Sequence, residues 1–559
     1  MTARSLGIRV AESLGALAGA RGSGCSSSAR NHVQHESVFE CSTHGTRRRI
    51  RIAVWISTLL FFSVGRATSA FAADRREGID GAINDAFRLI ADPMVETVFF
   101  SVPIGDAEVP LIVVWLIAGA IFFTFRLGFI NIRGFWHAVR IVAGKEDEAT
   151  GAAGEVSHFQ ALTTAVSGTV GVGNITHVAV AISIGGPGAT FWLVVAGFLG
   201  MASKFVECTL GVKYRRLNED GSVSGGPMFY LDEGLAALGR PRLGKSMAYY
   251  YAVCVIGGAL GAGCMFQANQ AYVQLVGVTG AEESFFATRG WLFGLLLAAL
   301  TGLVIVGGIR SIARVTSRLV PFMALLYISA ALVVIGANFD RIPAALYAIV
   351  SNAFAPESVS GGIIAVVMLG FRRAAFSNEA GIGSSAIAHS AVQTEEPLTQ
   401  GFVAMLEPFI DTVVICSITA LVVIVTVYDP VMLQDGAING VELTSSAFES
   451  VVPWFPHLLA VVVMLFAYST MISWSYYGLE GSIYLFGESR WVKLIYNTIF
   501  CGFIVVGTTS RLDAILDFSD SMIFAMALAN VFGLYMLAPG VRQDLDRYWT
   551  RVRARRTMG

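Results

Sequence analysis

Charged residues are scarce in this chain of 559 residues. Asp, Glu, Lys and Arg make up 14% of it, against about 25% in an average soluble protein. Apolar and aromatic residues reach 55%, and the mean hydropathy is +0.64. A soluble protein of this size needs more charges to cover its surface, so the composition predicts an all-α integral membrane protein.

Several function classes lack their usual signals. Lys and Arg number 39 and Asp and Glu number 40, so no net basic charge exists to hold a nucleic acid. The seven cysteines show no CxxC spacing, which argues against a zinc site and against a disulfide framework. The apolar segments contain neither HExxH nor GxSxG, and we expect no enzyme and no resident cofactor or metal.

The N-terminal region divides into three parts. Residues 1–46 show no helical or strand period, and we expect a disordered extension. Residues 47–73 combine a basic start, a short apolar run and an Ala-Phe-Ala end, which predicts a signal peptide. One more membrane helix is the alternative, although the run is shorter than the ~20 residues that a bilayer requires. Residues 74–107 would follow as an extracytoplasmic segment.

Apolar runs predict eleven transmembrane helices within a domain at 108–540. The expected spans are 108–126, 161–184, 187–212, 247–276, 291–308, 319–337, 361–392, 401–427, 456–485, 491–508 and 519–538. Lys and Arg follow the first, third and fifth spans and fill the tail at 541–559. The positive-inside rule therefore makes the C-terminus cytoplasmic, in the plasma membrane (the bacterial inner membrane).

An internal repeat appears when the sequence is compared with itself. At an offset of 210 residues and without a gap, four identities align: Gly171 with Gly381, Gly173 with Gly383, Pro187 with Pro397, and Thr209 with Thr419. Five spans separate the two copies, and five is odd. The second copy must therefore insert upside down, which predicts an inverted-topology repeat.

Both copies place glycines where a membrane helix is expected to be regular. The first reads SGTVGVGN (167–174) and the second SNEAGIGSS (377–385). Glycine costs about 1 kcal/mol in a helix interior relative to alanine, so this density predicts two discontinuous helices. Unwound main chain cannot be satisfied by lipid and requires polar partners, such as a substrate and its ion. Close helix packing through small residues is the alternative reading.

These segments resemble the alanine or glycine:cation symporter family, also called sodium:alanine symporters. The resemblance also rests on GGPGATFW (185–192), GMASKFVECTLGVKYR (200–215), GGPMFYL (225–231), FRRAAFSNEAGIGSSAIAHSA (371–391), QGFVAMLEPFIDT (400–412) and STMISWSYYG (469–478). It implies a leucine-transporter type of fold, with one leading helix followed by a 5+5 inverted repeat. It also implies symport of a small neutral amino acid with sodium or, less often, protons.

The resemblance implies roles for particular residues. The substrate would be bound by Gly171, Gly173, Asn174, Gln267 and Trp474. The cation would be bound by Thr169, Val170, Ser469 and Thr470, whose oxygen atoms suit a hard ion. One departure is Thr176-His177, where much of the family has small residues, and this weakens any assignment of alanine itself.

Charged residues within the spans must pair or line water. Lys204 and Glu207 stand at i and i+3, which favours an ion pair between them. Glu379, beside Ser377 and Asn378 in the second break, is expected to act in gating or coupling. Its expected partner is one of the two arginines at 372 and 373. His177 is interpreted as a hydrogen-bonded residue of the pocket, with proton coupling as the alternative.

Together these features predict a secondary transporter that works by alternating access, with a small neutral amino acid, a monovalent cation and the lipid bilayer as its partners. Na+ is the expected ion and H+ is possible, so a proton-coupled transporter of the same fold is the alternative. A channel is less favoured because the sequence shows no repeated polar rings.

Overall fold

A computed structural model describes residues 92–145, 153–219, 221–354, 361–428 and 440–558. The chain divides into two compact units, residues 1–61 and 62–559, and every described residue belongs to the second unit. The expected disordered extension, the expected signal peptide and the first part of the expected segment at 74–107 lie outside the described residues.

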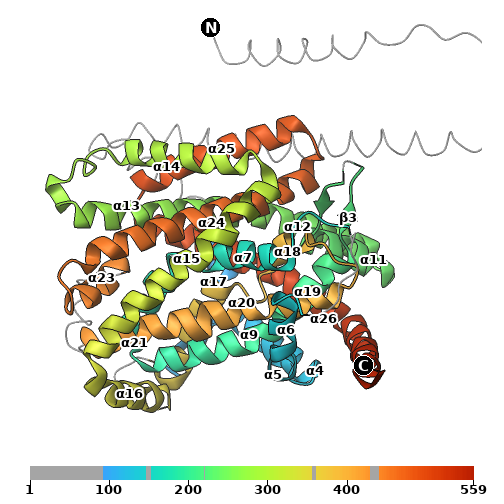
Figure 1. Cartoon of the computed structure of the whole chain (residues 1–559), viewed down its shortest axis with the longest axis horizontal. Helices are drawn as coiled ribbons and strands as arrows, with labels where there is room; N and C mark the ends of the chain where they lie inside the picture. Colours follow the sequence, from blue (N-terminus) through green and yellow to red (C-terminus); the bar gives the residue numbers. More distant parts are fainter. Residues whose placement is uncertain (1–91, 146–152, 220, 355–360, 429–439, 559) are drawn as a thin grey trace, which may run out of the picture. The chain divides into compact units, whose positions relative to one another are not determined.

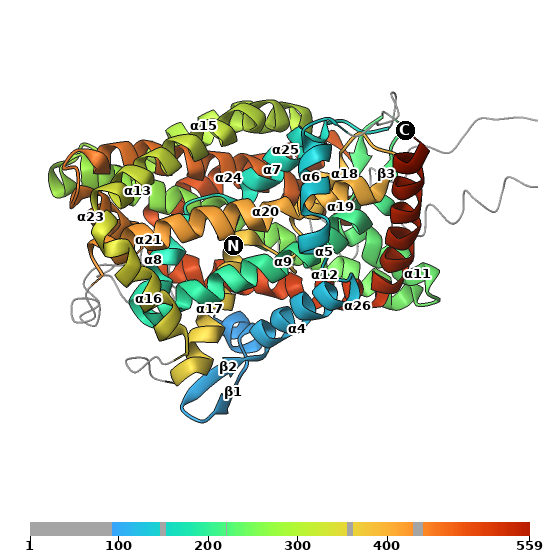
Figure 2. The same cartoon turned by 60° about the horizontal axis from the view of Figure 1, so that its bottom comes forward.

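The described chain consists almost entirely of helices (Figure 1). A hairpin of β1 (Ser101–Ile104) and β2 (Ala107–Pro110) precedes the first long helix and packs against α4 and α17 (Figure 2). The first half then contains α4 (Leu111–Arg126), α5 (Ile130–Arg133), α6 (Phe135–Val142), α7 (His158–Thr169), α8 (Gly173–Gly185), α9 (Gly188–Lys213), β3 (Arg216–Leu217), β4 (Val223–Ser224), α10 (Pro227–Phe229), η1 (Tyr230–Gly234), α11 (Leu235–Ala237), α12 (Pro241–Leu260), η2 (Gly261–Met265), α13 (Phe266–Val278), η3 (Ala281–Glu283), α14 (Gly290–Ile305), α15 (Gly308–Ala337), η4 (Phe339–Arg341) and α16 (Ile342–Phe354).

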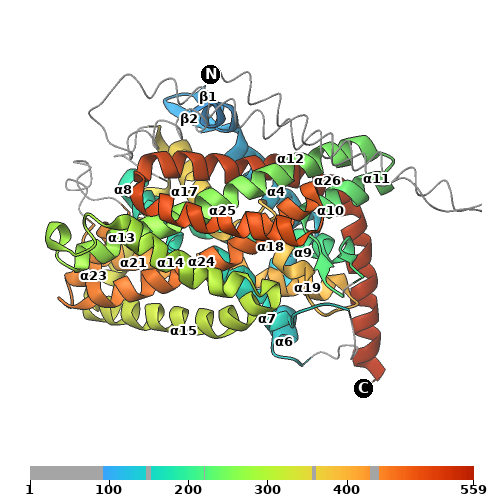
Figure 3. The ribbon, with the colours of Figure 1, turned by 90° about the horizontal axis from the view of Figure 1, so that it is seen from above.

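The second half also contains long helices and an interrupted helix, α17–α18. It contains α17 (Gly362–Asn378), α18 (Ser385–Ser390), α19 (Pro397–Ala404), α20 (Leu406–Pro408), η5 (Phe409–Cys416), α21 (Ser417–Thr426), α23 (Val441–Glu449), α24 (Phe455–Phe486), α25 (Arg490–Thr509) and α26 (Leu512–Met558). The expected tail at 541–559 continues α26 as a helix as far as Met558. The dark-red helix bends before its end in Figure 3, and Pro539 lies within it.

Each expected span overlaps one or more of these helices, and the expected span at 401–427 overlaps α19, α20, η5 and α21. Among the described residues, seven helical segments are long and apolar enough to cross a membrane, and the bent pair α7–α8 makes up to eight. Two more, α4 and α14, are apolar but have 16 residues each. The expected first span was too long at its start, because β2 occupies residues as far as Pro110.

Helices from the two halves pack against one another. Helix α9 contacts α19 and α20, α12 contacts α24, and α14 contacts α25. Figure 1 shows α9 running alongside α20 and α21. The interrupted helices α7–α8 and α17–α18 lie among these partners, since α17 packs on both α8 and α9, and α18 packs on α7. Both interruptions are therefore enclosed by protein.

The N-terminal end of α7 is joined to the C-terminal end of α18. Val156 and Val392 form a parallel bridge. Arg215 donates hydrogen bonds to main-chain oxygens on both sides, among them those of Ala153 and Ser390, each at 2.9 Å. Burial lowers the pKa of this guanidinium below its usual value, and the carbonyl oxygens replace the water that burial removes. The two segments are thus held together at this end.

Candidate functional site

The first break separates α7 from α8. Val170 has extended main chain (φ −76°, ψ 90°), and the two helices are bent by 42°. The Gly171 N–H donates to Asn174 Oδ1 at 2.9 Å, and the Val172 N–H donates to Gln267 Oε1 at 3.2 Å. Side chains therefore satisfy the two main-chain donors that the break exposes, as burial in a membrane protein requires.

The second break follows α17, which ends at Asn378. The Gly381 N–H donates to Glu207 Oε1 at 2.8 Å, and the Asn530 amide donates both to the Gly381 oxygen at 2.9 Å and to the same Glu207 oxygen at 2.8 Å. The Tyr251 hydroxyl donates to the oxygen of the next residue at 3.1 Å. Helices α9, α12 and α26 thus supply the polar partners of this break.

Glu379 stands at the start of the second break with φ 56°, in the left-handed region. An L residue with a side chain pays about 1–2 kcal/mol for this conformation, and helix ends of this kind usually carry glycine. Glu379 is also buried within a membrane protein. The left-handed conformation disfavours any residue with a Cβ, and burial disfavours a carboxylate, so Glu379 is a candidate functional residue.

Trp474 of α24 connects the two breaks. Its indole Nε1–H lies 3.2 Å from the Gly168 carbonyl oxygen, just before the first break, and 3.2 Å from Glu379 Oε1, in the second. The ring is almost completely buried. The Trp474 side chain can pack closely on η2 because residue 263 of that segment is glycine. A Cβ added at Gly263 would lie 2.3 Å from the Trp474 Cβ. One side chain thus holds both breaks at a fixed separation.

A small cavity of about 10 Å³, roughly the space that one water molecule needs, lies between the breaks. Its lining combines main chain and polar atoms with apolar walls and consists of Gly168, Thr169, Gly171, Gly173, Ala262, Gln267, Phe376, Ser377, Glu379, Trp474 and Ile523. The structure therefore brings together seven of the twelve residues singled out from the sequence. The other five, which do not line the cavity, are Val170, Asn174, Asn378, Ser469 and Thr470.

The residues expected at the cation lie around the first break. The Thr470 hydroxyl donates to the Ser167 oxygen at 3.0 Å, so α24 touches the end of α7 here. The Ser469 hydroxyl donates to the Phe466 oxygen of its own helix at 2.9 Å, and Thr169 likewise donates within α7. Thr470 is thus the member of the expected set whose side chain spans the two helices.

Asn174, Ser377 and Asn378 attach the broken helices to the π-helical segment η5. Asn174 Nδ2 lies 2.6 Å from Asp411 Oδ1, and the Ser377 hydroxyl donates to Asp411 Oδ2 at 2.8 Å. The Asn378 amide donates to the Thr412 hydroxyl at 2.9 Å. Asn174 therefore faces a protein carboxylate in this structure, on the side of α8 that carries the first break.

Two expected ion pairs are wrong. Lys204 pairs with Glu407 of α20, at 3.2 Å between Nζ and Oε2, while Glu207 turns to the second break. Glu379 accepts from the Ser384 hydroxyl and from Trp474, whereas the arginines at 372 and 373 lie near Asp520. Lys204 and Glu379 thus each contact a residue of a helix distant in the chain, Glu407 and Trp474 respectively, and not the charged residue expected nearby on their own helix.

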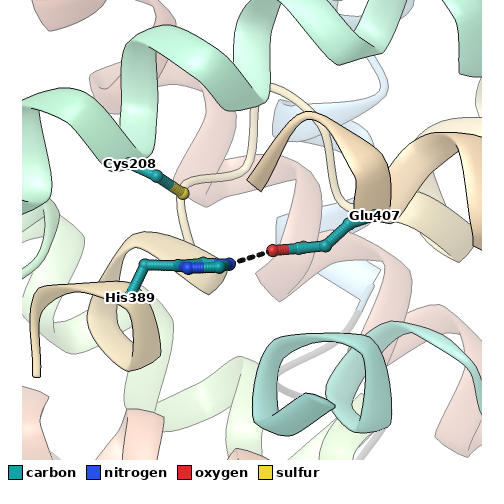
Figure 4. A group of neighbouring side chains, drawn as sticks. All are labelled: Cys208, His389 and Glu407. Carbon is teal, nitrogen blue, oxygen red and sulfur yellow. Dashed lines mark hydrogen bonds and ion pairs between the residues drawn. The ribbon is translucent and has the colours of Figure 1, made fainter. Parts of the chain in front are cut away.

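Glu407 is the centre of a buried polar cluster. Figure 4 shows His389 pointing its imidazole at Glu407, with Cys208 directed toward the same space. These three groups lie close enough to ligate a metal ion. However, Lys204 and the Ser385 hydroxyl already contact Glu407 Oε2, so the carboxylate has a cationic partner without a metal. We therefore assign the cluster to anchoring α18 against α9 and α20.

His177 has an unexpected setting. The interpretation as a hydrogen-bonded residue is wrong, since neither ring nitrogen has a partner within the described chain. Its ring packs on Phe376 and Phe266, with centroids 4.1 and 5.1 Å away. Phe376 also lines the cavity, so His177 lies behind one of the cavity walls.

Several polar residues of the site were missed from the sequence, namely Tyr251, Asn530 and Thr412. Each lies in an otherwise apolar span, and this is the signal that could have marked them. The sequence around each of them does not indicate which break it contacts, because partners such as Asn530 and Gly381 are far apart in the chain. Asp411 is also charged within an expected span, but its spacing in the sequence does not link it to either break.

Known proteins resemble this chain over most of its length. The sequence model of the sodium:alanine symporter family matches residues 98–558. The sodium/alanine symporter AgcS of Methanococcus maripaludis is 38% identical over 77% of this chain and 92% of the relative. The probable sodium/glutamine symporter GlnT of Bacillus subtilis is 33% identical over 79% and 89%. A crystal structure of a manganese transporter of Eremococcus coleocola aligns with a TM-score of 0.47 and 13% identity, covering 70% of this chain and 83% of that one.

Proposed function

The chain belongs to the sodium:alanine symporter family, and from this premise we propose that it carries a small neutral amino acid, alanine or glycine, together with Na+ by alternating access. Membership of this family makes the protein a cation:amino-acid symporter with several membrane-spanning helices, and not an enzyme. The identity of the substrate and the alternating-access cycle are the parts that we propose.

The observation that carries the proposal is the pair of interrupted helices around one cavity. Main chain at Gly171 and Gly173, the Gln267 amide and the Trp474 ring border this cavity. Because its volume is only about 10 Å³, these groups must move apart to admit even an amino acid with a short side chain. The Phe376 and Ile523 walls limit the size of that side chain. In our proposal Asn174 completes the substrate site by exchanging its hydrogen bond with Gly171 for one to the substrate.

We assign the cation site to Thr169, Val170, Ser469 and Thr470. The contact of Thr470 with the end of α7 supports this assignment, because both helices must approach for their oxygen atoms to share an ion. We assign coupling and gating to Glu379 with Ser377 and Asn378. The contacts of the Trp474 indole with Gly168 and Glu379 support that role, because a movement of one break displaces a hydrogen-bond partner of the other.

We further propose a leading helix followed by a 5+5 inverted repeat of the leucine-transporter type, with eleven spans in a domain at 108–540. Packing of α9, α12 and α14 on their counterparts α19, α24 and α25 supports it, because such pairs are expected from two related halves. The tail at 541–559 would be cytoplasmic, in the bacterial inner membrane.

Uptake by proteoliposomes tests the proposal. We expect saturable uptake of radiolabelled alanine and glycine under an inward Na+ gradient, and little uptake of larger neutral amino acids. One monovalent cation moving across 100 mV supplies about 2.3 kcal/mol, and a tenfold gradient supplies about 1.4 kcal/mol more. Uptake that is unchanged when K+ replaces Na+, but that follows an imposed pH gradient, would contradict sodium coupling and favour protons.

A further inference from the structure

Three charged side chains, Arg372, Arg373 and Asp520, connect α17 with α26 and are called the arginine–aspartate cluster. Arg372 Nη2 donates to Asp520 Oδ2 at 2.9 Å, whereas Arg373 Nη1 lies 3.9 Å from the same oxygen, beyond hydrogen-bond distance. In the described parts of the chain, no other acid forms an ion pair with either arginine. Two guanidinium groups thus share one carboxylate, and the cluster has one net positive charge.

The cluster contains buried polar atoms that have no hydrogen-bond partner within the described chain. They are Arg372 Nε, Arg373 Nε and Asp520 Oδ1. The other charged groups with such an atom, Glu207 and Glu480, are both acids, so it is here that a cation and an anion lack partners side by side. Buried polar groups are nearly always hydrogen-bonded in native proteins, so free donors and acceptors in one cluster indicate a place for a polar ligand.

The cluster lies between the protein surface and the cavity. The Arg372 side chain is 31% exposed, whereas the Asp520 side chain is 6% exposed. Arg373 and Asp520 each stand three residues before an apolar residue that lines the cavity, Phe376 on α17 and Ile523 on α26. Residues three apart lie on the same face of a helix, so these two apolar side chains separate the cluster from the cavity.

His177 of α8 stands on the same route. Its ring packs on Phe376, and the charged groups that act on it are those of the arginine–aspartate cluster. Both of its ring nitrogens lack a partner in the described chain. A polar solute that passes Phe376 would therefore meet an imidazole that is free to form hydrogen bonds.

We propose that the arginine–aspartate cluster is an outer binding site for the amino acid, which occupies it on its way to the cavity. This inference rests on the proposed function. An amino acid at neutral pH carries one carboxylate and one ammonium group. The Arg373 guanidinium is suited to bind the carboxylate through two parallel hydrogen bonds, and the free Asp520 Oδ1 is suited to accept from the ammonium group. Arg372 holds Asp520 in position through its other oxygen.

The position of the cluster makes it an entrance on one side of the cavity. Arg373 precedes the break between α17 and α18, whereas Arg215 binds the main chain of Ser390 at the far end of α18. The outer site and the Arg215 junction therefore lie at opposite ends of one interrupted helix. An amino acid held by the cluster has to displace Phe376 and Ile523 before it reaches the cavity.

Rapid mixing of the purified full chain with alanine in Na+ tests the outer site. Tryptophan fluorescence gives the association and dissociation rate constants, because Trp474 borders the cavity. Arg373→Gln is expected to lower both rate constants at least tenfold and to leave the equilibrium Kd within twofold of the wild type. The reason is that the outer site lies on the path in both directions but is not part of the final complex.

Arg341→Gln is the matched control. It makes the same change at an arginine whose guanidinium donates to the Val425 oxygen at 3.1 Å, outside the cluster. We expect it to leave both rate constants and the Kd unchanged.

Unchanged rate constants in Arg373→Gln would overturn the proposal. Faster ones would also overturn it, because they would show that the cluster only blocks the entrance, and so would a raised Kd with an unchanged association rate. If Arg373→Gln does not fold, Arg373→Lys is measured, which keeps the charge but not the paired hydrogen bonds. Both rate constants should then fall several-fold, and wild-type values overturn the proposal. Failure of the proposed function is distinguishable, because the wild type would then bind neither alanine nor glycine.

Discussion

Trp474→Phe is expected to separate the two breaks and weaken substrate binding. The substitution keeps an aromatic ring but removes the indole N–H that lies 3.2 Å from both the Gly168 oxygen and Glu379 Oε1. A hydrogen bond to a charged group contributes about 1.5–3 kcal/mol, and each 1.4 kcal/mol is a factor of ten. The population of the conformation in which both breaks adopt the arrangement described above should fall by about 10- to 150-fold. The apparent affinity for the amino acid falls in proportion to that population.

The assay is initial-rate uptake of radiolabelled alanine by proteoliposomes at saturating Na+. We expect the half-saturating alanine concentration to rise by at least tenfold in Trp474→Phe. Trp192→Phe is the control, because the Trp192 indole also donates to a carbonyl, that of Ala353 at 3.1 Å, but outside the cavity lining. Its half-saturation should stay within twofold of the wild type. Wild-type affinity and sodium dependence in Trp474→Phe would refute the role of the indole as a link.

Two further predictions concern the first break and the buried ion pair. Gly171→Ala places a Cβ 2.5 Å from Thr470 Oγ1, so we expect it to raise the half-saturating Na+ concentration several-fold. Gly277→Ala is the control, because a Cβ at this position meets nothing within 4 Å and should leave that concentration unchanged. Equal effects of the two substitutions would contradict a specific role of Gly171. Lys204→Met leaves Glu407 buried without a cation and should destabilise the protein by about 3–5 kcal/mol, seen as a lower thermal unfolding temperature in detergent. The double variant Lys204→Met/Glu407→Gln should recover part of this loss, because it no longer buries an unpaired carboxylate. An unfolding temperature equal to that of the wild type in Lys204→Met alone would refute the stabilising role of the ion pair.

The sequence was sufficient for the helices and for both interruptions. Each apolar run falls on helices, but several ends differ: α15 begins at Gly308 and not at 319, α26 begins at Leu512 and not at 519, and β2 occupies the start of the expected first span. The glycines at 171 and 381 marked the breaks because unwinding has a local cause that composition reveals.

The partners of the breaks could not be read from the sequence. Lys204 prefers Glu407 to Glu207, and Asn530 reaches Gly381, because helices distant in the chain pack side by side. Periodicity describes which face of a helix is apolar, but it does not state which neighbour a polar atom meets.

The junction at the ends of α7 and α18 has a mechanical consequence. Arg215 and the Val156–Val392 bridge fasten these two half-helices to each other, although they belong to different halves of the chain. While those contacts hold, neither half-helix can swing away by itself. In the alternating-access cycle that we propose, opening on this side requires either that both half-helices move as one unit or that Arg215 first releases its carbonyl contacts.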